Sequence, residues 1–161
     1  MDLFGEVVAL AAALDAAALD YAICGGVALA VHGAPRATKG IDILAREADM
    51  PRLREVVRRC GFTLEALPMT FSSSGVTIQR FTKVFEDGRT LMVDVLLAEG
   101  PLEAVWRTRS RIAFASPAAT PHALSVVSRE GLITLKLAAG RPQDIVDIQR
   151  LQEAARGSDD T

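Results

Sequence analysis

Two strand-like segments of this chain each hold a single aspartate between apolar residues, and this pattern limits the folds that the chain can adopt. The first is GIDILA, with Asp42, and the second is TLMVDVLLA, with Asp94. An ionised carboxylate among Val, Ile, Leu and Met side chains costs free energy unless a cation or hydrogen-bond donors compensate it. We therefore expect the two segments to be adjacent strands of one sheet, with both aspartates facing a polar partner.

Around these two segments, helix-like and strand-like patterns alternate along the chain. Asp87–Gly88 is a favoured pair in tight turns and predicts a hairpin between 76–85 and 90–98. Ser128 can cap the helix that follows it. The predicted helices are 3–14, 27–33, 49–61, 101–106, 129–140 and 142–156, and the predicted strands are 21–24, 40–45, 76–85, 90–98, 111–115 and 124–128.

This order of elements predicts a mixed β-sheet flanked by helices, of the α/β or α+β class. The chain has 161 residues and is 50% hydrophobic, which suits one compact domain with its own core. We expect that single domain over residues 1–155 and a polar C-terminal tail over 156–161.

Charge and hydropathy argue against two classes of protein. The formal net charge is -2, without the strong basic bias of a dedicated nucleic-acid binder. No uncharged apolar run reaches the roughly 18 residues of a membrane-spanning helix, which indicates a soluble, cytoplasmic protein. Cys24 and Cys60 lack zinc-ligand spacing and are interpreted as small buried side chains.

Two clusters of arginines stand out in a chain whose net charge is close to zero. They comprise Arg52, Arg54, Arg58 and Arg59 on one predicted helix, and Arg107, Arg109 and Arg111 beyond the next. Together they would form a surface for an RNA acceptor, whereas separately each is an ordinary solvated face. The sequence leaves both interpretations open.

Gly25 and Gly26 lie where a strand-like segment passes into a helix-like one. Backbone N–H groups are unpaired at such a helix start, and the missing side chains let a phosphate approach them closely. The same glycine pair is also typical of a tight turn with no ligand.

Asp42 and Asp94 are candidate ligands of Mg²⁺, which accepts carboxylate oxygens, waters and substrate phosphates together. Side chains at positions i and i+2 share one face of a strand, so a carboxylate at position 40 would stand beside Asp42. Gly40 occupies that position and offers no ligand.

The segments around these residues resemble the signature of small nucleotidyltransferases of the DNA polymerase beta superfamily, in particular the toxin-like branch exemplified by the AbiEii abortive-infection toxins. The signature positions in this chain are Gly25, Gly26, Arg36, Thr38 and Asp42, the last within RATKGIDIL. That family has an Asp-x-Asp pair on one strand and a third aspartate on a neighbouring strand, where this chain has Asp94.

The C-terminal segment LITLKLAAGRPQDIVDIQRL is also similar to this branch, which has a lysine on one helix and Arg-x-x-Asp-x-x-Asp on the next. The matching residues are Lys136, Arg141, Asp144 and Asp147. By this resemblance the catalytic residues are Asp42, Asp94 and Lys136, with Mg²⁺ on Asp42 and Asp94, and the nucleotide-binding residues are Gly25, Gly26, Arg36, Thr38 and Asp144.

Several of these residues have a structural interpretation as well. Lys136 can reach a triphosphate or can extend from an apolar helix to water. Asp144 is in the first turn of a helix, where an acidic side chain also favours the helix dipole. Arg36 can pair with phosphate or hold its loop by an ion pair, and Thr38 can hydrogen-bond the backbone.

The resemblance implies transfer of a nucleoside monophosphate from an NTP to an unknown acceptor, and an antitoxin-like protein partner. Gly40 departs from it, because the family has the first aspartate of Asp-x-Asp there. A degenerate protein, an enzyme with a single Mg²⁺, or an altered residue would each explain the glycine. The alternative function is a non-catalytic nucleotide-sensing or partner-binding module on the same fold.

Overall fold

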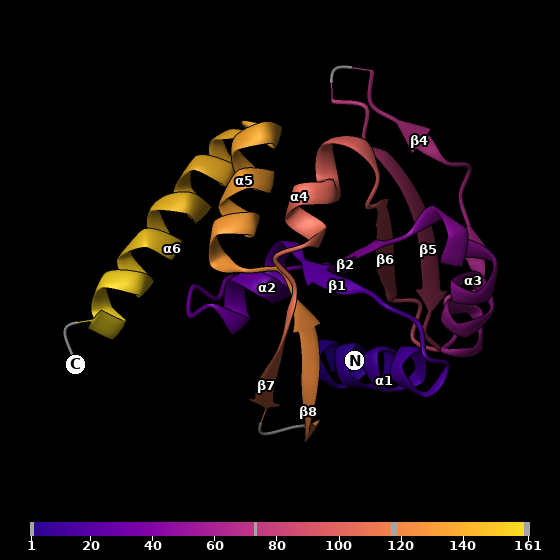
Figure 1. Cartoon of the computed structure of the whole chain (residues 1–161). Helices are drawn as coiled ribbons and strands as arrows, with labels where there is room; N and C mark the ends of the chain where they lie inside the picture. The colour runs from indigo at the N-terminus through magenta and orange to yellow at the C-terminus, as the bar shows by residue number, and fades with distance from the viewer. Residues whose placement is uncertain (1, 73, 117–118, 160–161) are drawn as a thin grey trace.

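The computed structural model describes residues 2–72, 74–116 and 119–159 (Figure 1). The helices are α1 (Leu3–Ala16), α2 (Gly25–Val31), α3 (Met50–Arg59), α4 (Glu103–Trp106), α5 (Arg129–Ala139) and α6 (Pro142–Asp159). The strands are β1 (Ala22–Cys24), β2 (Gly40–Ala45), β3 (Leu64–Glu65), β4 (Met69–Thr70), β5 (Thr77–Val84), β6 (Thr90–Leu97), β7 (Ser110–Ser116) and β8 (Ala119–Val126).

The strands form one mixed sheet in the order β3-β5-β6-β2-β1-β8-β7, and β4 also pairs with β5. β2 and β6 run parallel, as do β1 and β8, and the other pairs are antiparallel. The predicted fold class, a mixed sheet flanked by helices, is therefore confirmed, and so is the predicted hairpin of β5 and β6.

The turn of that hairpin is one residue longer than the two-residue turn that Asp87–Gly88 favours. The N–H of Phe85 donates to the carbonyl of Arg89 over 2.8 Å, and the N–H of Gly88 donates to the carbonyl of Phe85 over 2.9 Å. The loop thus comprises 86–88, and Gly88 adopts the left-handed conformation with φ of 85°. The extra residue sets the register of β5 against β6.

The two faces of the central strands have different surroundings. On one face, Ile41 and Ile43 of β2 are buried against Leu10 and Leu14 of α1. Asp42 points to the opposite face because successive side chains of a strand alternate. The apolar isoleucines on either side of Asp42 therefore determine which face the aspartate can occupy.

The two C-terminal helices pack together, as Figure 1 shows for α5 and α6. The hydroxyl of Ser128 accepts a hydrogen bond from the N–H of Gly131 over 2.9 Å, so the predicted cap of α5 is confirmed. Gly140 ends α5 in the left-handed conformation, and Pro142 begins α6. This tight connection brings the end of one helix close to the start of the next.

Several boundaries differ from those that the sequence predicts, and α2, for example, begins at Gly25 instead of 27. β8 begins at Ala119 instead of 124, because its pairing with β7 extends the strand upstream. α6 continues to Asp159, past its predicted end at Arg156, whereas residues 160–161 of the expected tail lie outside the described residues. The short strands β3 and β4 have no apolar pattern of their own and exist through pairing with β5.

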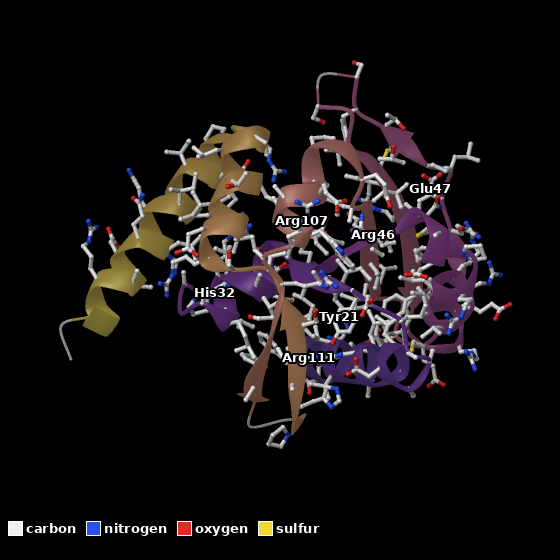
Figure 2. All side chains as sticks on the ribbon, viewed as in Figure 1. Tyr21, His32, Arg46, Glu47, Arg107 and Arg111 are labelled. Carbon is white, nitrogen blue, oxygen red and sulfur yellow. The ribbon has the colours of Figure 1, made fainter. Side chains whose placement is uncertain are left out.

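Four of the seven arginines in the two clusters have an acidic partner among the described residues. Arg54 pairs with Glu65, and Arg111 binds both carboxylate oxygens of Asp15. Figure 2 shows Arg107 beside α4 and Arg111 near α1 and β7. An RNA acceptor stays a prediction without support from this arrangement.

No helix in the described part of the chain is long and apolar enough to span a membrane. 

Gly26 in α2 has no room for a side chain, which leads to a stability prediction. A Cβ there would lie 2.6 Å from both Cβ and Oγ1 of Thr38. We expect Gly26→Ala to lower the free energy of unfolding by about 2 kcal/mol in urea denaturation. Gly157→Ala, in open space on α6, is the control and should be neutral or stabilising. Equal stability of Gly26→Ala and the wild type would show that the loop at Thr38 moves to accommodate the added methyl group at little cost in free energy.

Candidate functional site

The register of the sheet places four polar or reactive side chains in a row on one face. Arg80 on β5 lies opposite Asp94 on β6, Asp94 lies opposite Asp42 on β2, and Asp42 lies opposite Cys24 on β1. The predicted placement of Asp42 and Asp94 on neighbouring strands is therefore confirmed. Their roles as catalytic residues and metal ligands stay predictions.

This row forms one wall of a cavity of about 580 Å³, within the size range of small-molecule sites. A second wall comes from α5 and the start of α6, and a third from the segment around β4 and the start of β5. The charged side chains that line it are Asp42, Arg80, Asp94, Lys136, Arg141 and Asp144. The apolar ones include Met69, Phe71, Val76, Ile78, Leu96, Leu132 and Leu135.

Gly25 is required where β1 passes into α2 beside this wall. Its φ is 64°, and a Cβ at this position would collide with the carboxylate of Asp42. Only glycine combines the left-handed conformation with such a close approach. Gly25 lines the cavity, as expected of a nucleotide-binding residue, and its nearest neighbour there is the carboxylate of Asp42.

Gly26 and Thr38 do not belong to the described lining of the cavity. They contact each other instead, and the hydroxyl of Thr38 donates to the carbonyl of Gly40 over 3.3 Å. The structure thus gives both residues a packing role, which corresponds to the backbone-bonding interpretation of Thr38. A direct contact between either residue and a nucleotide stays a prediction.

Lys136 of α5 is buried between two carboxylates of α6. Its Nζ donates to Asp147 over 2.9 Å and lies 3.6 Å from Asp144. Arg36 also reaches Asp147, through Nε over 3.0 Å, and so fastens the loop before β2 to α6. Of the two interpretations of Arg36, the structure supports the ion pair that holds its loop. Lys136 is part of the lining of the cavity, and its burial contradicts the interpretation in which it extends to water.

Asp144 is held by Arg141 at the start of α6. Nε and Nη2 of Arg141 donate to its two carboxylate oxygens over 2.8 and 3.2 Å. Burial by itself would raise the pKa of Asp144, but the hydrogen bonds from Arg141 and the charge of Lys136 hold that pKa below its ordinary value. Asp144 is therefore an ionised carboxylate whose first partner is a protein cation.

Asp42 has the opposite electrostatic surroundings. Its removal from water, followed by repulsion from Asp94, raises its pKa from 3.8 to about 6. Lys136, Arg80 and Arg141 each lower it, but too weakly to cancel these effects. Among the six charged residues of the cavity, Asp42 has no ion-pair partner in the described part of the chain.

Arg80 is a cavity residue that the sequence analysis missed. Its Nε and Nη2 donate to the two carboxylate oxygens of Asp94 over 2.8 and 3.0 Å. The sequence carries no signal for it, because Asp87–Gly88 favours a two-residue turn and the observed loop is one residue longer. A two-residue turn would set Arg80 opposite Val95, on the other face, whereas the three-residue loop sets it opposite Asp94.

The donor set is a poor match to a site for a pair of divalent cations, which an Asp-x-Asp pair and a third aspartate would hold together. Mg²⁺ prefers six oxygen ligands, several of them from carboxylates and substrate. Here Gly40 supplies none, and both oxygens of Asp94 accept from Arg80. Within the described ranges, no three His, Cys, Asp or Glu side chains are grouped as metal ligands. The residues present therefore do not fit a pair of divalent cations.

Comparison with solved structures shows which fold this is. No protein-family model matches the sequence, and no curated protein matches it either. The antibiotic-resistance factor ANT(2'')-Ia superposes with a TM-score of 0.58 at 19% identity, over 98% of this chain and 85% of its own. The chain has the nucleotidyltransferase fold.

Two further structures share this nucleotidyltransferase fold. A nucleotidyltransferase-like antigen from Paracoccidioides brasiliensis matches with a TM-score of 0.53 at 19% identity, over 91% of this chain and 74% of its own. The lincosamide antibiotic adenylyltransferase LnuA, solved with lincomycin, matches with a TM-score of 0.50 at 13% identity, over 92% and 96%. At these identities the comparison establishes the arrangement of the elements and leaves the toxin-like branch untested.

The buried position of Lys136 leads to a second stability prediction. Replacing it with methionine removes the cation between Asp144 and Asp147 and leaves buried carboxylates with fewer partners. We expect Lys136→Met to lower the free energy of unfolding by about 3 kcal/mol at pH 7. Lys39→Met, at an exposed lysine, is the control and should change it by less than about 0.5 kcal/mol. Similar values for the two variants would contradict the buried ion-pair network.

The raised pKa of Asp42 makes stability depend on pH. The folded pKa is about 6, above the ordinary 3.8, so between these values the folded chain binds more protons than the unfolded chain. The contribution of Asp42 to stability is therefore full below about pH 4 and declines as pH rises through about 6.

The readout is the stability gained by Asp42→Asn, measured by urea denaturation of the ligand-free protein. This gain should be larger at pH 7 than at pH 4 by on the order of 1–3 kcal/mol. Asp20→Asn, at an exposed carboxylate, should show no such trend. A gain for Asp42→Asn that does not change with pH would contradict the raised pKa.

Proposed function

We propose that this protein binds a nucleoside triphosphate in the cavity and transfers its nucleoside monophosphate to a hydroxyl group of an acceptor. The observation that carries this proposal is the opposition of Asp42 and Asp94 on parallel strands, in a cavity that Lys136 and Arg141 also line. Carboxylates beside cations allow one site to bind phosphates and to accept a proton. The nucleotidyltransferase fold supports the same reaction class.

In the proposed reaction, the acceptor oxygen attacks the α-phosphorus of the NTP. The bond from that phosphorus to the oxygen of the leaving pyrophosphate breaks, and the hydroxyl proton passes to a base. Asp42 is the base, because a carboxylate with a pKa of about 6 is suited to accept protons near neutral pH. Lys136 and Arg141 stabilise the charge that develops on the phosphate oxygens.

The apolar part of the cavity suits the non-phosphate parts of the substrates. Phe71 and Met69 line the cavity and are half-exposed, and Leu132 and Leu135 of α5 line it as well. A nucleobase or the body of a small acceptor can pack on such surfaces. We propose a small-molecule acceptor over RNA, since no arginine of the two clusters belongs to the described lining of the cavity.

A second candidate function is a nucleotide-binding module without catalysis. Two observations favour it: Gly40 lacks the carboxylate of the family signature, and Arg80 already engages both oxygens of Asp94. Such a module would bind the NTP in the same cavity and release it unchanged. The two functions therefore differ in turnover and share the binding site.

The toxin-like assignment and its antitoxin-like partner are a separate part of the proposal. They are supported by the C-terminal residues of the resemblance, because Lys136, Arg141 and Asp144 come together at the cavity. An adjacent reading frame whose product co-purifies with this chain would support the assignment. A chain that is harmless when expressed alone and has no such neighbour would contradict it.

Incubation with each of the four labelled NTPs and a panel of hydroxyl compounds tests the proposed transfer. We expect labelled product from the wild type, and a loss of at least about 100-fold in kcat for Asp42→Asn, as for a missing general base. The NTP affinity of Asp42→Asn should stay within about threefold of the wild-type affinity. Asp20→Asn is the matched control and should be fully active. Binding without turnover would establish the non-catalytic module, and absence of NTP binding would overturn both functions.

A further inference from the structure

Arg80 has an unused group that points to a role beyond its pair with Asp94. A guanidinium carries five N–H donors on three nitrogens. Nε and Nη2 of Arg80 are engaged by Asp94, and no acceptor for Nη1 is found among the described residues. The side chain lines the cavity and is 39% exposed. Arg80 therefore presents a positive charge with free donors to whatever the cavity binds.

A divalent cation in a phosphate site joins protein carboxylates on one side to phosphate oxygens on the other. Arg80 has the same two-sided geometry, with the carboxylate of Asp94 on one edge and the free Nη1 on the other. The planar guanidinium is also well matched to phosphate, to which it can donate two parallel hydrogen bonds.

We propose that Arg80 takes the place of a divalent cation in this cavity, so that the protein binds the phosphates of its ligand without metal. The proposal rests on phosphate binding in the cavity, which is part of the proposed function. It accounts for Gly40, because a site without metal does not need the carboxylate that this position lacks.

A second arginine–aspartate pair, Arg141 and Asp144, lines the cavity in the same way. Arg141 donates Nε and Nη2 to Asp144, and its Nη1 likewise has no acceptor within the described part of the chain. The two arginine–aspartate pairs come from the sheet and from α6, respectively, and both line the same space. A polyphosphate between them would receive donors from both sides while each aspartate remained neutralised.

The surroundings of Gly40 disfavour a carboxylate side chain at this position. A Cβ at this position would lie 3.0 Å from the backbone carbonyl of Met92, a contact tighter than side chains normally make. Restoring the family carboxylate at position 40 thus requires β2 and β6 to shift slightly. Even then Asp94 would remain bound to Arg80, so release of Asp94 is the step that matters for metal binding.

Titration with Mn²⁺ alone, followed by the electron paramagnetic resonance of free Mn²⁺, tests whether Arg80 displaces a cation. We expect Arg80→Gln, which frees Asp94 beside Asp42, to bind Mn²⁺ at least about 10-fold more tightly than the wild type. Arg89→Gln, on the same hairpin and paired only with Asp87 in the described chain, should match the wild type. Wild-type binding of Mn²⁺ as tight as that of Arg80→Gln would overturn the proposal.

Calorimetry with inorganic tripolyphosphate tests whether Arg80 binds phosphate without a metal, since this probe needs no nucleobase pocket. The wild-type affinity should differ by less than about threefold between EDTA and Mg²⁺, and Arg80→Gln should lose at least about 10-fold in EDTA. Arg80→Lys keeps the positive charge but lacks the planar guanidinium, so its affinity for tripolyphosphate should lie between those of the wild type and Arg80→Gln. Thermal unfolding of each variant confirms that it is folded.

The outcomes separate the two proposals. Wild-type binding of tripolyphosphate only with Mg²⁺ would overturn the role of Arg80 and leave the proposed function standing. Absence of tripolyphosphate binding in both conditions would overturn phosphate binding by Arg80 together with the proposed function. In that case the Mn²⁺ titration still decides whether Arg80 keeps a metal from Asp94.

Discussion

The register of three central strands is the constraint on which the rest of this structure depends. Because β2, β6 and β5 pair in one specific alignment, Ile41, Val93 and Phe81 face the core while Asp42, Asp94 and Arg80 face the cavity. A slip of one residue would bury the charges and expose the apolar side chains. The apolar residues flanking each charge therefore hold the polar row in place.

Charge pairing explains how so many ionised groups are tolerated around one cavity. Asp94 has Arg80, Asp144 has Arg141, and Lys136 joins Asp144 and Asp147 across the two C-terminal helices. Each pair avoids the large cost of a lone charge removed from water. Asp42 is the exception: it has no ion-pair partner among the described residues, and removal from water raises its pKa to about 6.

A shared fold does not establish shared chemistry, and this chain illustrates where the two separate. The elements, their order and the opposed strands correspond to known nucleotidyltransferase structures. Position 40 and the partner of Asp94 are local features that the fold leaves free to vary. In this chain position 40 has no carboxylate, and both carboxylate oxygens of Asp94 accept from Arg80.

The sequence by itself determined most elements, because apolar periodicity and turn residues act locally. It also predicted the adjacency of Asp42 and Asp94, because a carboxylate among apolar residues needs a polar partner. It did not determine the edge strands β3 and β4, which depend on a distant partner, or the longer ends of β8 and α6. Only the tertiary structure placed Arg80 on Asp94, since that contact depends on one additional loop residue. Likewise, only folding brought Arg36 to Asp147, 111 positions away, because no local pattern encodes such a contact.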